Sequence, residues 1–345
     1  MRALLFFRTK EHAMKAMVLD GINLPLTVKF IKKPTLKANE VLVRIKAAAL
    51  NRRDFWIQKG QYAGLRFPII LGSDGAGIVE EVGSESESVW IGKEVIMNPS
   101  LSWGDNEAVQ SADFKILGLP QDGTFAEYVK IPVQNLHHVP AHLTLIEAAA
   151  IPLGGLTAWR ALFSKAQLKK GEKVLIVGVG GGVATFVLQW AIHAGAEVYV
   201  TSGKKHKIAK AIDMGAKAGV LYTDKDWAEK IKQEDGFDVI VDSSLGKGFV
   251  HHIDLARPGG RIVFFGGTAS GDLPELNARK IFWKQLSILG STMGSPNDFS
   301  EMIAFVNKHQ IKPIVDSIFP LEHAEEAIRK MDHSDQFGKI ILKVD

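Results

Sequence analysis

A glycine cluster at residues 178–184 constrains the fold of this chain more than any other feature. The cluster reads Gly-Val-Gly-Gly-Gly-Val-Ala, follows the apolar run 173–177 and precedes a helical stretch at 184–193. A strand, a tight glycine turn and a helix in this order are typical of a dinucleotide-binding loop, because glycine lets the backbone approach a pyrophosphate at the helix N-terminus. The alternative is a glycine-rich turn in another α/β sheet, since the third glycine of G-x-G-x-x-G is Val183 here. The residues predicted to hold the phosphates are Gly178, Gly180, Gly181, Gly182 and Val183.

On either side of this loop, short apolar runs alternate with helical stretches. The alternation predicts an α/β fold with a doubly wound parallel sheet, a Rossmann domain over residues 150–295. The predicted strands are 173–177, 197–200, 218–222, 238–241, 261–265 and 286–289, and the helices nearby are 145–150, 156–163, 299–308 and 321–331.

The remaining residues, 1–149 and 296–345, predict a second, mainly β domain. Short β-type runs such as 41–45 and 77–82 are separated by turn residues. The chain ends in a strand-like run at 338–342, which needs an open sheet edge as its partner. We expect that edge in the β domain, and the Rossmann domain is then an insertion between its two parts.

The second predicted strand ends in Thr-Ser-Gly-Lys-Lys-His-Lys at residues 201–207. Sites for NAD usually carry an acidic residue at this point, which binds the ribose 2′-hydroxyl. Hydroxyls and ammonium groups without an acid suit a 2′-phosphate instead, so the predicted cofactor is NADPH/NADP. A solvated, lysine-rich start of a helix is the alternative. The residues predicted to recognise the phosphate are Thr201, Ser202 and Lys205.

The amino-acid composition argues against several classes of function. The chain has no cysteine, which excludes disulfides and cysteine nucleophiles and favours a cytoplasmic location. Its net charge of +4 comes without a long basic cluster, so we expect no nucleic-acid partner. No apolar run is long enough to span a membrane, and the apolar start at residues 3–7 is too short for a signal peptide. Residues 1–13 are interpreted as an extension before a first strand that starts at Met14.

Several further motifs bear on the family. Together with the glycine loop they resemble the medium-chain dehydrogenase/reductase superfamily, in particular its zinc-free quinone oxidoreductase-like branch. The resemblance implies a GroES-like catalytic domain beside an NADP-binding Rossmann domain. The segments that carry it are 48–54, 72–77, 123–128, 151–158 and 338–340.

The resemblance also indicates that the catalytic metal is absent. Zinc-dependent members carry cysteine where this chain has Asn51, and Gly-His-Glu where it has Gly72-Ser73-Asp74. Zinc prefers thiolate, imidazole or carboxylate ligands, so we predict no metal. The pairs His137-His138 and His251-His252 do not change this prediction, because adjacent histidines in a strand point to opposite faces.

By the same resemblance, residues 51–62 line the substrate side of the family's cleft. Asn51 and Tyr62 are the predicted catalytic residues, Arg52 and Arg53 are further possible donors, and Trp56 is a candidate apolar wall. The simpler interpretation makes Asp54 a helix cap and Tyr62 a surface aromatic residue. The resemblance assigns to the nicotinamide side Thr157, Ser243, Phe265, Gly266 and Thr292.

Three functions fit these features. The first is an NADPH-dependent oxidoreductase that reduces a small quinone or α,β-unsaturated carbonyl without zinc. The second is an NADPH-dependent aldehyde or ketone reductase of alcohol dehydrogenase type, and the third is a non-catalytic NADPH-binding protein. The resemblance also implies a homodimer that pairs through the edge strand near residues 286–290.

Overall fold

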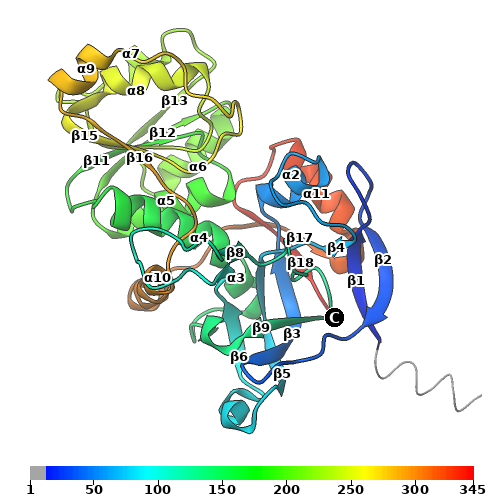
Figure 1. The fold of residues 1–345 in the computed structure, drawn as a ribbon. Coiled ribbons are helices and arrows are strands. Elements are labelled where there is room, and N and C mark those ends of the chain that lie inside the picture. The colour runs from blue at the N-terminus through cyan, green and yellow to red at the C-terminus, as the bar shows by residue number, and fades with distance from the viewer. Residues whose placement is uncertain (1–12) are drawn as a thin grey trace, which may run out of the picture. The chain divides into compact units, whose positions relative to one another are not determined.

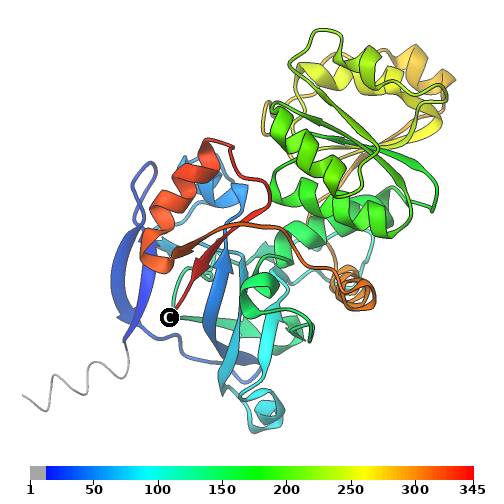
Figure 2. The ribbon, with the colours of Figure 1, turned by 180° about the vertical axis from the view of Figure 1, so that it is seen from behind.

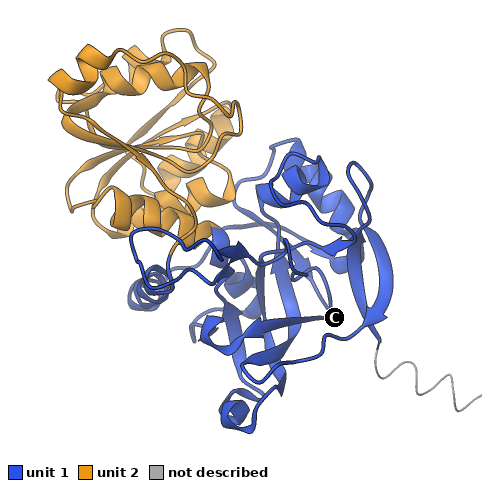
Figure 3. Ribbon diagram, in the orientation of Figure 1, with its two compact units in different colours: residues 1–153, 295–345 blue, residues 154–294 orange. Residues whose placement is uncertain are grey.

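The structure, a computed structural model, describes residues 13–345. The chain divides into two compact units (Figure 3). Unit 1 contains the described residues up to 153 together with 295–345, and unit 2 contains residues 154–294. The extension expected at residues 1–13 lies outside the described residues except for Ala13, where the first strand begins.

Unit 1 is built on two sheets that share one apolar core. The central strand of the larger sheet, β3 (Glu40–Ala49), pairs antiparallel with β5 along most of its length, with β9 over residues 40–44 and with β18 over residues 47–49. Most side chains of β3 are buried, because both faces of this strand are covered. The other strands of this sheet are β5 (Asp74–Val82), β6 (Glu94–Met97), β9 (Tyr128–Pro132), β10 (Leu136–His138), β17 (Val315–Pro320) and β18 (Lys339–Lys343).

Shorter elements complete unit 1 (Figure 1). A three-stranded sheet has the order β2-β1-β4, and a small ribbon pairs β7 with β8. These strands are β1 (Ala13–Leu19), β2 (Thr27–Lys32), β4 (Ile69–Ile70), β7 (Ser100–Leu101) and β8 (Lys115–Ile116). The helices are α2 (Arg52–Gln58), α3 (Leu145–Ala149), α10 (Pro296–His309) and α11 (Ala324–Asp332).

The last strand confirms the expectation that unit 2 interrupts unit 1. Strand β18 lies between β17, to which it is parallel, and β3, to which it is antiparallel. Its apolar residues Ile340 and Leu342 enter the same core cluster as Val41 and Val43 of β3. Residues far apart in the sequence therefore share one core.

Unit 2 contains the predicted parallel sheet, with the strand order β13-β12-β11-β14-β15-β16. Helices α5 and α6 cover one face of the sheet, and α8 and α9 cover the other (Figures 1 and 2). All residues of β14 are buried, as expected for a strand enclosed on both faces. The strands are β11 (Lys173–Val177), β12 (Glu197–Ser202), β13 (Ala218–Leu221), β14 (Phe237–Asp242), β15 (Ala256–Phe264) and β16 (Ser287–Gly290).

The helices of unit 2 depart from the sequence prediction in one place. The single helix expected at 156–163 is α4 (Pro152–Trp159) followed by a π-helical segment at Arg160–Lys165. The others are α5 (Gly182–His193), α6 (Lys205–Asp213), α7 (Trp227–Ile231), α8 (Val250–Leu255) and α9 (Ala278–Trp283). Within residues 13–345, no helix combines the length and the apolar character required to cross a bilayer.

Candidate active site

The glycine loop of unit 2 joins β11 to α5. Gly178 and Gly180 have φ angles of +77° and +126°, a region that residues with a Cβ rarely adopt. Among the described residues, no side chain caps the start of α5 at Gly181. The first amide groups of this helix therefore remain available to a phosphate, and the helix dipole favours its charge.

The hydroxyls of Thr201 and Ser202 lie against this loop. The Gly178 amide donates to Thr201 Oγ1 at 3.0 Å, and Ser202 Oγ lies 3.4 Å from the Val179 carbonyl to which it donates. Both residues are buried, so their hydroxyls hold the loop to the end of β12. Lys205, the third residue predicted here, is exposed at the first position of α6.

Two residues that sequence reasoning missed complete this region. Lys207 is only 7% exposed, and its Nζ would lie 3.1 Å from a Cβ placed on Gly180. The Tyr222 hydroxyl similarly would lie 2.7 Å from a Cβ placed on Gly203. An ammonium group therefore covers the glycine loop, and a phenol covers the tip of the second strand. The helical spacing of Lys204 and Lys207 offered a signal for the first, but nothing local indicated the second.

The remaining residues of unit 2 predicted for the cofactor follow the carboxyl ends of neighbouring strands. Ser243 follows β14, Phe265 and Gly266 follow β15, and Thr292 lies two residues beyond β16. Thr157 is buried within α4. Because β12 and β13 lie on one side of β11 and β14 on the other, the glycine loop opens at the point where the strand order reverses.

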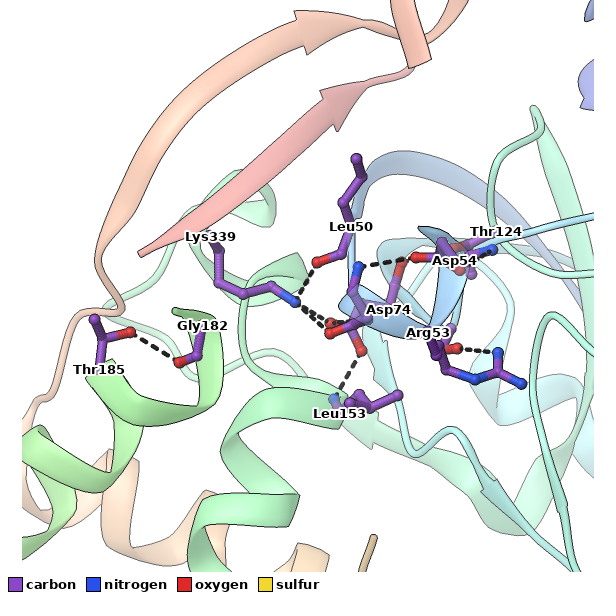
Figure 4. Close-up of polar contacts among 12 residues, drawn as sticks. Leu50, Arg53, Asp54, Asp74, Thr124, Leu153, Gly182, Thr185 and Lys339 are labelled. Atoms are coloured by element: carbon purple, nitrogen blue, oxygen red, sulfur yellow. Dashed lines mark hydrogen bonds and ion pairs between the residues drawn. The ribbon is translucent and has the colours of Figure 1, made fainter. Parts of the chain in front are cut away.

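In unit 1, the predicted catalytic residue Asn51 precedes α2 and contacts a buried ion pair. Its Nδ2 donates to Asp74 Oδ2 at 2.9 Å, and its Oδ1 accepts from Lys339 Nζ at 2.7 Å. Lys339 also donates to Asp74 Oδ2 at 2.7 Å and to the Leu50 carbonyl at 2.8 Å (Figure 4). Asp74 is completely buried, and its Oδ1 accepts from the Leu153 amide at 2.7 Å. This network fixes the orientation of the Asn51 amide.

Asp54 stabilises the start of α2, as the simpler interpretation of the sequence expected. Its carboxylate accepts from the backbone amides of Asn51 at 2.8 Å and Gly72 at 3.3 Å. Complete burial raises the pKa of Asp54 to about 6, and the charge of Arg53 and these two hydrogen bonds partly offset the rise.

Arg53 lies between Ser73 and Tyr62. Its Nη1 donates to Ser73 Oγ at 2.8 Å and to the Leu117 carbonyl at 3.0 Å. Its Nε lies 3.5 Å from the hydroxyl of half-buried Tyr62, and the guanidinium carbon is 5.0 Å from the centre of that ring. The other candidate donor, Arg52, donates to Ser334 Oγ at 2.9 Å. The structure therefore brings Arg53 and Tyr62 together, while Asn51 belongs to the neighbouring network.

The donor set around Asn51 and Ser73 does not suit zinc. Asn51 contacts the Lys339 ammonium and Ser73 contacts the Arg53 guanidinium, so each proposed ligand position faces a cation. Among residues 13–345, no group of three or more histidine, aspartate or glutamate side chains is arranged to hold a metal. The residues present therefore do not fit the metal that the wider family carries.

The histidine pairs have separate structural roles. In β10, His137 packs against Phe299 and His138 stacks on Trp90, on different sides of the strand. The argument from strand geometry does not apply to His251 and His252, because both lie in helix α8. His252 pairs with Asp242 at 2.9 Å, whereas His251 packs against Trp227.

Two features define the class of this protein: a dinucleotide loop in a Rossmann unit, and a separate β unit with a polar site. Together they are typical of a nicotinamide-dependent oxidoreductase. Residues 37–141 match the model of the alcohol dehydrogenase GroES-like domain, and residues 182–308 match that of the zinc-binding dehydrogenases. The chain belongs to the medium-chain dehydrogenase/reductase superfamily, as the sequence motifs indicated.

Individual relatives cover nearly the whole chain. A zinc-type alcohol dehydrogenase-like protein of Schizosaccharomyces pombe is 36% identical, over 90% of this chain and 92% of the relative. The quinone oxidoreductase of Homo sapiens is 28% identical, over 97% and 99%. A crystal structure of an NAD-dependent alcohol dehydrogenase matches with a TM-score of 0.89 and 37% identity, over 96% of this chain and all of that one. The relatives thus differ in the substrates and cofactors that their names state.

Proposed function

We propose that the protein is an NADPH-dependent reductase of small quinones or α,β-unsaturated carbonyl compounds that acts without zinc. The observation that carries this proposal is the pair of cations, Lys339 and Arg53, that contact Asn51 and Ser73, the residues at two positions where zinc-dependent relatives have ligands. Without a metal, the charge that develops on the substrate oxygen must be stabilised by hydrogen-bond donors. A conjugated substrate spreads that charge over several atoms, so it needs less stabilisation by these donors than an unconjugated aldehyde or ketone does.

The NADPH preference rests on the groups around the glycine loop. Lys207, Lys204 and Lys205 lie at the start of α6, Tyr222 covers Gly203, and residues 201–207 contain no acid. An ion pair with a 2′-phosphate at 4 Å contributes about 4 kcal/mol before solvation, at an effective dielectric of about 20. Desolvation and screening reduce the net preference to about 1–3 kcal/mol, roughly 5- to 150-fold over NADH. Some relatives are named as NAD-dependent, so membership of the family does not decide the cofactor. The proposed NADPH preference therefore rests on the residues of this chain alone.

Bound NADPH supplies the hydride. The residues proposed to hold its phosphates are those of the glycine loop, whose amides and helix N-terminus suit a pyrophosphate. The nicotinamide side is assigned to Thr157, Ser243, Phe265, Gly266 and Thr292. On the substrate side, Tyr62 is proposed to donate a proton or polarise the oxygen, and Asn51 to hold the local geometry through Asp74 and Lys339.

Reduction of an aldehyde or ketone is the second candidate, favoured by the relatives named as alcohol dehydrogenases. A screen of NADPH and NADH oxidation over quinones, enones and aldehydes tests both candidates. Product analysis with one enone then separates C=C from C=O reduction. Tight NADPH binding without turnover of any carbonyl would instead support the non-catalytic alternative.

Zinc content is a separate test of the proposal. Elemental analysis of active protein is expected to find zinc far below one atom per chain. Loss of activity on chelation, with recovery when zinc is added, would contradict the metal-free mechanism.

We also propose a homodimer and, because the chain has no cysteine, a reducing compartment such as the cytoplasm. Strand β16 ends the parallel sheet, and the neighbouring helix α9 leaves Phe282 and Trp283 67% and 82% exposed. A sheet edge next to exposed aromatic side chains favours pairing with a second copy. Light scattering is expected to give a dimer at micromolar concentration, and a monomer would contradict the assignment.

A further inference from the structure

Arg53 is a buried cation whose hydrogen-bond partners among the described residues are all neutral groups. The residue is only 7% exposed, and within residues 13–345 no carboxylate forms an ion pair with it. The carboxylate of the adjacent Asp54 accepts instead from two backbone amides. The charges of Arg53 and Asp54 attract each other, but no ion-pair contact joins the two side chains. Because a buried charge is costly unless it is paired, this guanidinium is suited to bind a further anionic partner.

The guanidinium is held rigidly on one side and is unoccupied on the other. Nη1 makes two hydrogen bonds, to Ser73 Oγ and to the Leu117 carbonyl, and Nε faces the Tyr62 hydroxyl. Nη2 makes no hydrogen bond with residues 13–345, and it is not one of the polar atoms that are sealed from solvent without a partner. In Figure 4 the Arg53 guanidinium turns one nitrogen toward its drawn partner and another away from all the residues drawn.

The hydrogen bonds also orient Tyr62. If Arg53 Nε donates to the Tyr62 oxygen, the phenol proton must point elsewhere, toward a third group. Nη2 and this proton are then two donors on neighbouring residues, fixed by Ser73 and Leu117, and available to the same oxygen atom. A preorganised pair of donors of this kind stabilises charge where it develops during reaction.

We propose that Arg53 is a catalytic residue that replaces the metal as the electrophile, with Nη2 bound to the substrate carbonyl oxygen. This inference rests on the proposed reductase function. As the hydride forms the new C–H bond at the substrate carbon, the π electron pair moves to the oxygen, and dihydronicotinamide is oxidised. Arg53 stabilises the resulting enolate or alkoxide. The Tyr62 proton, replaced from solvent, then completes the two-electron reduction.

The test uses the full chain and the variants Arg53→Met, Arg53→Lys and Arg66→Met. Arg66 is an exposed arginine on the loop after Tyr62 that donates to the Pro120 carbonyl, so it serves as the matched control. Three measurements are made: steady-state kinetics (kcat and KM) with methyl vinyl ketone, NADPH affinity by fluorescence, and affinity for acrylate by ligand-observed NMR. Acrylate offers a carboxylate oxygen in place of the enone oxygen.

For Arg53→Met we expect kcat to fall about 10²- to 10³-fold, the loss typical of an oxyanion donor, with NADPH affinity unchanged. Acrylate affinity should fall at least 10-fold, and Arg66→Met should match the wild type in all three measurements. A kcat within threefold of wild type together with unchanged acrylate binding would show that Arg53 only links Ser73 to Leu117.

Two further outcomes distinguish a failure of this inference from a failure of the proposed reductase function. If Arg53→Met does not fold, Arg53→Lys decides, because lysine keeps the charge but loses the planar guanidinium, whose separate nitrogens bind Ser73, Leu117 and the substrate oxygen. Its kcat should fall about 10- to 100-fold, and wild-type kcat would overturn the proposal. If the wild type turns over no carbonyl, the proposed reductase function fails. Acrylate binding then decides for Arg53 alone, and equal affinity in wild type and Arg53→Met overturns its role as an anion-binding residue.

Discussion

Replacing Lys207 with methionine tests the choice of cofactor at a single atom. The substitution keeps most of the apolar stem that covers Gly180 and removes the buried ammonium group. If Nζ binds the 2′-phosphate, the loss is the net energy of one partly desolvated ion pair, about 1–3 kcal/mol. The kcat/KM with NADPH should then fall roughly 5- to 150-fold, whereas kcat/KM with NADH should change less than threefold.

The assay compares both cofactors with one substrate at constant ionic strength, because salt screens such pairs. Lys210→Met is the control, since Lys210 lies one turn further along α6 and is exposed. An equal fall with NADPH and NADH would refute the reasoning, because it would mean that Lys207 binds the pyrophosphate that both cofactors share. No fall with either would remove Lys207 from the cofactor site.

Three other predictions concern unit 1. Tyr62→Phe should lower kcat about 10²- to 10³-fold with an enone or aldehyde, measured by steady-state kinetics; a few-fold change confined to KM would make Tyr62 a packing residue. Lys339→Met should lower the free energy of unfolding by about 3–5 kcal/mol in urea, because Asp74 keeps a buried charge, and the double variant with Asp74→Asn should recover part of it. The pKa of Asp54 is about 6 in the folded protein against 3.8 for the free side chain, so the folded state binds more protons between these values and stability should fall by about 2 kcal/mol as pH rises from 3.8 to 6. Urea denaturation across that range measures the fall, and Asp54→Asn should flatten it; a slope unchanged by the substitution would assign the effect to other groups.

Features set by short-range sequence patterns were the ones that could be predicted. The glycine loop could be predicted because its strand, turn and helix are contiguous in the sequence. The six strands of unit 2 could be predicted because they are short, buried apolar runs. The boundaries moved by a few residues, as in β15, which begins at Ala256 although the apolar run begins at residue 261. Hydrogen bonding to neighbouring strands, which no local pattern reveals, sets those limits.

The details of the site depend on contacts between distant residues. Lys339 reaches Asp74 across 265 positions, and Arg53 reaches the Leu117 carbonyl across 64. Sequence reasoning placed Asn51, Arg53 and Tyr62 in one segment of the site but had no means of finding Lys339 beside Asn51. Likewise, Thr201 and Ser202 were selected for their hydroxyls, yet the residue type alone does not tell whether a hydroxyl faces the glycine loop or a ligand.

The position of β18 has a consequence for how the protein is made. Its residues Ile340 and Leu342 fill the core of unit 1, and Lys339 neutralises Asp74. During synthesis, β3 and Asn51 leave the ribosome long before this strand, with all of unit 2 translated in between. Unit 2 can therefore fold while unit 1 still lacks its last strand, and a nascent chain that stops before residue 339 leaves Asp74 uncompensated. The proposed substrate site around Asn51 is therefore completed only when the last strand has been synthesised.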